Sequence, residues 1–239
     1  MPRPIVTLLT DFGARDPSAA ICKGVVLSIA PDAQVIDISH EVDKYAIRDG
    51  ALLLWCALPY LPIGAHMAVV DPGVGTARRP VAVRAARGDT LVGPDNGLLM
   101  PAAERLGGVT RVHLLEAPEY RLPVTSASFH GRDVFAPAAA HLALGVGIER
   151  LGRELDPAEL VDLSIERVSV MPGRLDTAIV YVDTFGNVKL GGVTADLTAA
   201  VGAVAPGDRL VLEIGGPGAS AGVSLELPWQ LTFGLVAVG

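Results

Sequence analysis

The chain has 239 residues, of which half are hydrophobic and 5% are aromatic, and its formal net charge is −7. This length suits one large domain or a large and a small one, and the aliphatic bias suits parallel strands buried beneath helices. The acidic balance, without any run of Lys and Arg, argues against a nucleic-acid-binding protein, which needs a basic face.

Strands and helices are expected to alternate from the N-terminus to residue 71. Asp16 followed by Pro17 predicts a helix start, with the aspartate as the cap and the proline in the first helical position. The order of elements predicts an α/β fold with a largely parallel sheet and flanking helices. The expected elements are a strand at 4–10, a helix from 16 to 30, a strand at 34–38, a helix at 46–61 and a strand at 66–71.

Three polar residues, Asp11, His40 and Asp71, lie at or just past the carboxyl ends of these strands. In open α/β sheets, ligands bind beyond the carboxyl ends of the strands. We therefore expect the three side chains on one rim of the sheet.

The α/β pattern continues to about residue 165, which we take as the end of an N-terminal domain, 1–165. His130 and Gly131 lie directly before the last expected helix of this domain. The expected elements are strands at 80–85 and 90–93, a turn at 93–97, a short helix near 98–106, a strand near 109–114 and a helix from about 133 to 144.

From residue 166 the pattern changes to short strand-like runs separated by Gly and Pro, with one short helical stretch near 193–201. This composition predicts a second, smaller all-β domain at the C-terminus, 166–239. The expected strands lie at 166–171, 175–183, 208–214, 222–227 and 232–238.

The two cysteines, Cys22 and Cys56, lie in separate apolar segments and do not have the spacing of a metal site. The N-terminus has no signal-peptide pattern, and no apolar run approaches the length of about 20 residues that spans a membrane. We therefore expect a cytoplasmic protein that binds neither a membrane nor a metal ion.

Five motifs resemble those of the S-adenosyl-L-methionine hydrolases (adenosine-forming), which are relatives of the bacterial fluorinase and chlorinase. Their order and spacing are similar to the family's across about residues 5–190. The motifs are Thr10-Asp11-Phe12-Gly13 with the following Asp16 and Cys22-Lys23-Gly24, the segment 69–75 (VVDPGVG), the segment 93–99 (GPDNGLL), Phe129-His130-Gly131-Arg132-Asp133, and Asp183-Thr184-Phe185-Gly186-Asn187.

The resemblance implies a homotrimer in which the substrate lies between the N-terminal domain of one subunit and the C-terminal domain of its neighbour. Family members usually continue with a final hairpin that contacts the substrate, whereas this sequence ends at Gly239, near where that hairpin would begin. We therefore expect part of the substrate clamp to be missing or replaced, either because the C-terminal domain is truncated or because it has diverged.

The resemblance also implies the catalytic residues. Hydrolases of this family have an Asp, an Arg seven positions later and a distant His, and this sequence has Asp71, Arg78 and His130 in those places. Halogenases lack that set and have an extra loop, for which the short turn between 80–85 and 90–93 leaves no room. The resemblance therefore favours water over a halide as the nucleophile.

The sulfonium of S-adenosyl-L-methionine is a good leaving group, so the reaction needs no cofactor. The enzyme has to place water about 3 Å from the ribose 5′ carbon, opposite the sulfur. Asp71 can orient this water, and Arg78 and His130 can hold Asp71.

Other residues match positions that hold the rest of the substrate in the family. The resemblance implies that Asp11 binds the ribose hydroxyls and that Asp183 binds the methionine ammonium. The further expected substrate-binding residues are Asp16 and Ser18 near the methionine end, Asn187 and Phe185 at the adenine, Tyr45 against the ligand and Phe129 in the wall of the nucleophile pocket.

Other interpretations are open at this stage. Asp71 before Pro-Gly could be only a turn former, and Arg79 rather than Arg78 could be the arginine that matters. The chain could bind adenosyl ligands without turnover, or it could be a halogenase. A metal-dependent hydrolase is a further alternative, with its ligands drawn from Asp11, Asp16, His40, Asp71 and His130.

Overall fold

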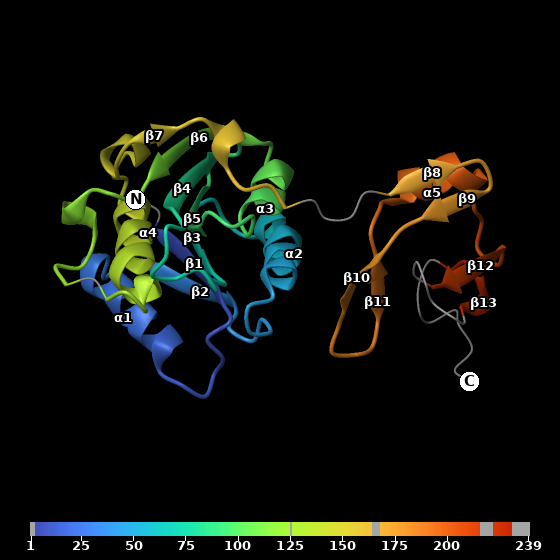
Figure 1. The fold of residues 1–239 in the computed structure, drawn as a ribbon, viewed down its shortest axis with the longest axis horizontal. Coiled ribbons are helices and arrows are strands. Elements are labelled where there is room, and N and C mark those ends of the chain that lie inside the picture. Colours follow the sequence, from blue (N-terminus) through green and yellow to red (C-terminus); the bar gives the residue numbers. More distant parts are fainter. Residues whose placement is uncertain (1–2, 125, 164–167, 216–221, 231–239) are drawn as a thin grey trace. The chain divides into compact units, whose positions relative to one another are not determined.

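A computed structural model describes residues 3–124, 126–163, 168–215 and 222–230. The chain forms two compact units, Met1–Ile165 and Glu166–Gly239. Figure 1 shows the elements of both units.

The first unit is built on a mixed sheet of seven strands in the order β2-β1-β3-β5-β4-β6-β7. The pairs β1–β2, β1–β3 and β3–β5 are parallel, and the other three pairs, which include the β4–β5 hairpin, are antiparallel. The sheet is therefore mixed, whereas a largely parallel one was expected. The strands are β1 (Ile5–Thr10), β2 (Gln34–Ser39), β3 (Ala65–Val69), β4 (Pro80–Ala85), β5 (Thr90–Pro94), β6 (Val109–Leu114) and β7 (Glu154–Leu155).

Helices cover both faces of this sheet, as Figure 1 shows, and the expected α/β fold with flanking helices is confirmed. Alternate side chains of β1 enter the two hydrophobic layers, because successive residues of a strand point to opposite faces. Leu8 packs in the layer that contains α1 and α4, and Leu9 packs in the layer that contains α2 and α3. These helices are α1 (Ser18–Ile29), α4 (Ala136–Ala143), α2 (Ile47–Ala57) and α3 (Met100–Arg105).

Two helix starts differ from the expectation. Helix α1 begins at Ser18, Pro17 takes the cap position, and no side chain caps the helix, so the prediction that Asp16 caps it is wrong. The helix expected from about residue 133 begins earlier, as a π-helix at Gly131–Phe135 that continues into α4. Short 3₁₀ helices lie at Leu58–Tyr60, Pro118–Tyr120, Ile148–Arg150 and Pro157–Glu159.

The described residues of the second unit form three two-stranded antiparallel pairs, which confirms the expected small region of strands, and one helix at the short helical stretch. The last expected strand, at 232–238, lies outside the described residues. The elements are β8 (Ser169–Met171), β9 (Arg174–Asp176), β10 (Ile179–Val182), β11 (Val188–Leu190), α5 (Thr194–Val201), β12 (Arg209–Ile214) and β13 (Val223–Pro228).

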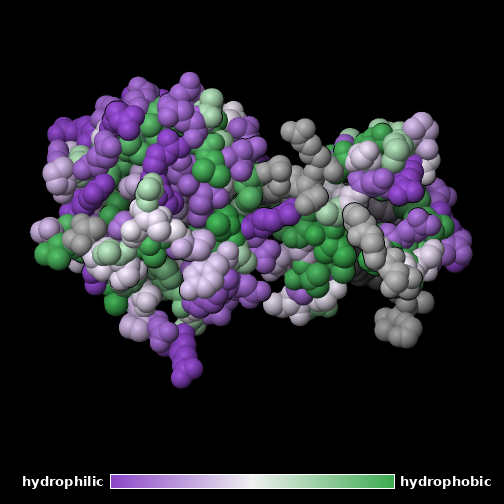
Figure 2. Space-filling model, in the orientation of Figure 1, coloured by the Kyte–Doolittle hydropathy of each residue, from purple (hydrophilic) through white to green (hydrophobic). Residues whose placement is uncertain are grey.

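Hydrophobic side chains lie on the surface of the second unit, as Figure 2 shows. Within this unit Phe185 is 91% exposed and Val211 is 65% exposed. Such a surface is typical of a region that binds a partner. Among the described residues of the whole chain, no helix has the length and apolar character needed to cross a membrane.

Candidate active site

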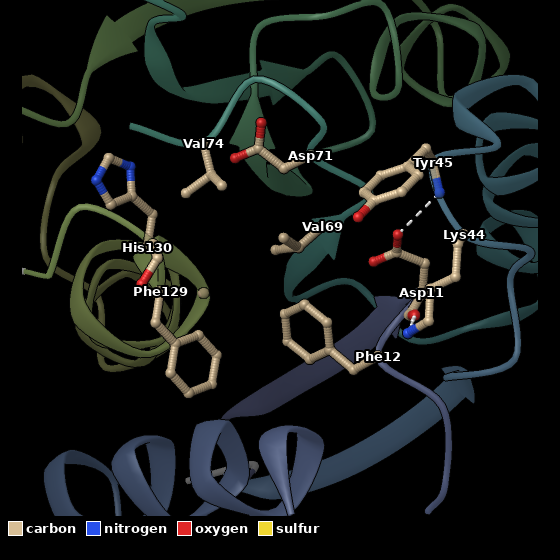
Figure 3. Close-up of a pocket in the computed structure, with 11 residues that line it drawn as sticks. Asp11, Phe12, Lys44, Tyr45, Val69, Asp71, Val74, Phe129 and His130 are labelled. Atoms are coloured by element: carbon tan, nitrogen blue, oxygen red, sulfur yellow. Dashed lines mark hydrogen bonds between the residues drawn. The ribbon is translucent and has the colours of Figure 1, made fainter. Parts of the chain in front are cut away.

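A pocket of about 240 Å³ lies where β1 and β3 end. The register of these strands pairs Thr10 with Val69, so the residues that follow them leave the sheet side by side. This is the rim on which an α/β sheet binds its ligands. The pocket, shown in Figure 3, is lined by Asp11, Phe12, Lys44, Tyr45, Val69, Asp71, Val74, Ser128, Phe129, His130 and Gly131.

The structure brings Asp71, Arg78 and His130 together at one wall of the pocket. The guanidinium of Arg78 donates from Nε to Oδ1 of Asp71 across 3.0 Å and from Nη2 to Oδ2 of the same carboxylate. Nη2 also lies 3.2 Å from Nδ1 of His130. Asp71 and His130 line the pocket, whereas Arg78 lies behind them with its side chain 7% exposed.

The imidazole of His130 is neutral at pH 7. Burial lowers its pKa from the ordinary value of 6.5, and the neighbouring charge of Arg78 lowers it further. Because a guanidinium can only donate, Nδ1 of His130 is the acceptor in the contact with Arg78. The proton of the neutral ring is therefore on Nε2.

The loop that follows β3 folds back on itself, so that the side chain of Arg78 reaches Asp71. Two turns shape it, since the N–H of Val74 donates to the carbonyl of Asp71 across 3.3 Å and the N–H of Thr76 donates to Gly73 across 3.1 Å. Gly75 has a φ of 77°, and a Cβ there would lie 2.5 Å from the carbonyl oxygen of Ala127. Only glycine fits this position, where the loop approaches the segment that carries His130.

Asp11, on the other side of the pocket, is held by the segment after β2. The backbone N–H of Tyr45 donates to Oδ2 of Asp11 across 3.0 Å, and the ammonium of Lys44 donates to the carbonyl of Asp11 (Figure 3). Tyr45 has a φ of 66° and is the one non-glycine residue with positive φ among the described residues. A side chain in this region costs about 1–2 kcal/mol, and such strain is typical of functional sites.

Aromatic rings close the lower side of the pocket in Figure 3. Phe12 and Phe129 meet edge to face, with their centroids 5.8 Å apart. A Cβ at Gly131 would lie 3.0 Å from Cζ of Phe12, so the backbone approaches this ring closely. With Val69 and Val74, these rings give the pocket apolar walls beside its two carboxylates.

The other expected substrate residues do not line this pocket. Asp16 is exposed and Ser18 is half-buried at the start of α1. Three more belong to the second unit, where Oδ1 of Asp183 accepts from the N–H groups of Phe185 and Asn187, at 2.9 Å each. A hydrogen bond from the Asn187 side chain is the main cause that lowers the pKa of Asp183.

The sequence analysis assigned no role to six of the lining residues, which are Phe12, Lys44, Val69, Val74, Ser128 and Gly131. The position of Phe12 directly after the strand-end Asp11 was a usable signal, whereas nothing in the sequence distinguishes Lys44. His40 supports the rim from behind, since its Nδ1 lies 2.8 Å from the hydroxyl of Thr10.

Two alternatives can be compared with this geometry. Arg79 bonds to Asp95 across 2.8 Å and to the carbonyl of Glu159, away from Asp71, so Arg78 is the arginine at the pocket. Among the described residues, no group of three or more His, Cys, Asp or Glu side chains could hold a metal ion. The five residues of the metal-dependent alternative therefore do not form a metal site in the described part of the chain.

Residues 6–152 match the family described as the SAM hydroxide adenosyltransferase N-terminal domain. The (R)-S-adenosyl-L-methionine hydrolase of Salinispora arenicola is 46% identical over 80% of this chain and 73% of its own length. The enzyme of that name from Thermus thermophilus is 42% identical over 99% and 86%. Proteins named fluorinase match at 29–30% identity. The crystal structure of an uncharacterized conserved protein from Thermotoga maritima, 31% identical, has a TM-score of 0.88 over 98% of this chain and 86% of that one.

Proposed function

The chain belongs to the SAM hydroxide adenosyltransferase family, and we propose that it splits S-adenosyl-L-methionine with water into adenosine and L-methionine. One observation in the described residues supports this function most directly. The guanidinium of Arg78 joins the carboxylate of Asp71 and the imidazole of His130 at the wall of a pocket on the ligand-binding rim.

The proposed reaction is an in-line substitution at the ribose 5′ carbon. The oxygen of water forms a bond to this carbon while the bond from carbon to sulfur breaks. The electron pair of that bond goes to sulfur, so the sulfonium leaves as the neutral thioether of methionine. The attacking water loses one proton, which is released to the solvent, and becomes the 5′ hydroxyl of adenosine.

Asp71 is the proposed acceptor of a hydrogen bond from the attacking water. Arg78 occupies one direction at each carboxylate oxygen, and each oxygen keeps a further lone pair for the water. His130 cannot accept through Nδ1, which faces Arg78, and its Nε2 is protonated at pH 7. In this arrangement the carboxylate orients the water, and the arginine and histidine fix the carboxylate.

Asp11 is the proposed partner of the ribose hydroxyls. The N–H of Tyr45 orients its carboxylate at the side of the pocket opposite His130 (Figure 3). The apolar walls around Phe12 and Val69 exclude water from the rest of the reaction site. Asp16 and Ser18 remain the proposed contacts to the methionine end.

We propose that the second unit completes the site of a neighbouring subunit in a homotrimer. Asp183 would then bind the methionine ammonium, and Phe185 and Asn187 would contact the adenine. The 91% exposure of the Phe185 side chain supports this role, because a large exposed aromatic is typical of a binding surface. If light scattering shows that the active protein is a monomer, the shared site is contradicted.

The proposal includes neither a metal nor an organic cofactor, because a thioether leaves a sulfonium carbon without electrophilic assistance. A cytoplasmic location is also proposed. The unpaired Cys22 and Cys56 support it, since free thiols are typical of reducing compartments.

A halide-using reaction is the second candidate, and the fluorinase relatives motivate it. The carboxylate of Asp71 at the pocket wall disfavours it, because a negative charge repels a halide ion. Incubation of the protein with S-adenosyl-L-methionine and excess chloride or fluoride separates the two. Adenosine as the nucleoside product supports hydrolysis, and a 5′-halogenated nucleoside contradicts it.

A further inference from the structure

Asp133 is an acidic residue with no solvent exposure, two positions beyond the pocket-lining Gly131. Three donors satisfy its carboxylate. Arg132 donates from Nε to Oδ1 across 2.6 Å and from Nη2 to Oδ2 across 3.0 Å, and the backbone N–H of Ser126 donates to Oδ2 across 2.7 Å. Burial pushes the pKa of Asp133 upward, but these hydrogen bonds outweigh it and lower the pKa, so the group is ionised.

The backbone of Asp133 is tied to the same segment. Its N–H donates to the carbonyl of Phe129 across 3.2 Å, and its carbonyl accepts from the N–H of Leu122 across 2.9 Å. One residue thus holds Leu122, Ser126 and Phe129. These contacts span the stretch that provides Ser128, Phe129 and His130 to the pocket.

Arg132 links this anchor to the aromatic wall. Its guanidinium lies over the ring of Phe129, 5.1 Å from the centroid, and Phe129 in turn meets Phe12. These residues lie at a π-helix, Gly131–Phe135, whose geometry departs from the α-helix that follows. Such irregular turns occur frequently at functional sites.

We propose that Asp133 is a positioning residue for hydrolysis, whose buried carboxylate fixes residues 126–131 so that His130 meets Arg78 and Phe129 closes the pocket. Ser126 and Arg132 transmit this constraint to the loop. The inference deepens the proposed function and rests on it. Without the carboxylate, the N–H of Ser126 and the fork of Arg132 lose their shared acceptor, and the imidazole of His130 leaves its place beside Arg78.

Asp133→Asn tests the role, with Asp89→Asn as the matched control. Asp89 is equally buried and accepts from Arg87 at 2.7 and 2.9 Å and from His66 at 2.8 Å, but it does not line the pocket. We expect Asp133→Asn to lower kcat by about 10- to 100-fold, because small misplacements of reacting groups cost that much. Asp89→Asn should lower thermal stability and leave kcat within about twofold of the parent, in line with a purely structural contact.

The pH profile provides a readout that a merely structural role would not move. The charged groups that act on His130 are Arg78 and Arg121, which lower its pKa, and Asp71 and Asp133, which raise it. Asp133→Asn removes one of the two anions, but it also frees His130 from Arg78, whose charge acts more strongly on the pKa of His130, so the acid limb of kcat should move to higher pH. Arg132→Lys keeps both charges but removes the paired hydrogen bonds of the guanidinium to Asp133. It should therefore lower kcat and move the acid limb less than Asp133→Asn does.

Amide hydrogen exchange makes the test independent of turnover. Residues 126–131 should exchange faster in Asp133→Asn and in Arg132→Lys than in the parent or in Asp89→Asn. If Asp133→Asn fails to fold, Arg132→Lys supplies the same comparison. Unchanged exchange in this segment together with an unmoved acid limb overturns the positioning role. Faster exchange in Asp133→Asn, together with a parent protein that does not hydrolyse S-adenosyl-L-methionine, would sink the proposed function and leave the anchor in place.

Discussion

Nη2 of Arg78 donates to Nδ1 of His130 across 3.2 Å, and this contact fixes which nitrogen of the ring carries the proton. The same guanidinium holds Asp71, so a single cation sets the orientation of both pocket-lining groups. A proton added to Nδ1 would face the guanidinium directly. Protonation of His130 therefore breaks the contact and places two cations side by side.

We expect activity to have an acid limb with a midpoint below pH 6.5. Burial and Arg78 lower the folded-state pKa of His130 from 6.5, so the neutral, active form persists below that pH. The free energy of unfolding should depend on pH in the same direction as activity. The unfolded chain binds the proton more readily, so the contribution of His130 is present above pH 6.5 and is lost as the pH falls through the folded-state pKa.

The measurement is a pH profile of kcat for the parent, His130→Gln and His141→Gln. Burial also lowers the pKa of His141, which packs against Tyr120 away from the pocket, so this variant should keep the limb. The His130→Gln variant should have a low kcat, and its pH profile should lack the acid limb. A parent midpoint above 6.5 contradicts the neutral imidazole.

Asp71→Asn should lower kcat by about 10²–10⁴-fold and leave adenosine binding nearly unchanged, because the proposed contact is with the attacking water. Asp11→Asn should instead weaken adenosine binding, since its proposed partners are the ribose hydroxyls. Calorimetry with adenosine and single-turnover kinetics separate the two effects. Normal turnover by Asp71→Asn, or a loss of affinity alone, disproves the assignment.

Arg78→Lys and Arg79→Lys form a second matched pair. Lysine cannot span Asp71 and His130 with a planar fork, so Arg78→Lys should reduce kcat by at least about tenfold. Arg79 instead joins Asp95 and Glu159, and its replacement should lower the melting temperature with little effect on kcat. Equal losses of kcat in both variants would argue against a special role for Arg78.

The strand-end rule predicted the part of the site that depends on local pattern. Asp11 and Asp71 follow apolar runs that form β1 and β3, and parallel pairing of these runs places both residues on one rim. The fold class followed from the same alternation of strands and helices. The pairing of Arg78 with Asp71 was expected only from the family resemblance, because nothing local distinguishes Arg78 from Arg79.

Features set by tertiary contacts could not be predicted. The left-handed conformation of Tyr45 depends on the carboxylate of Asp11, which lies 34 positions away in the chain. The burial of Asp133 depends on its contact with Ser126, and an aspartate in an Arg-Asp pair is usually exposed. Asp16 has the residue type of a helix cap, yet the chain turns at Pro17 and no cap bond forms.

Removal of metal ions should leave activity unchanged. The proposed leaving group is a neutral thioether, which needs no Lewis acid. Turnover is measured with the protein dialysed against a chelator and with stoichiometric zinc or manganese restored. A loss on chelation that metal reverses would favour the metal-dependent alternative.

The origin of the 5′ oxygen of adenosine tests the central claim most directly. The protein is incubated with S-adenosyl-L-methionine in ¹⁸O-labelled water, and the nucleoside product is analysed by mass spectrometry. The account predicts adenosine with one ¹⁸O at the 5′ position, formed together with methionine in equal amount, and little product from Asp71→Asn. Adenosine without the label, or no adenosine from the parent protein, would contradict it.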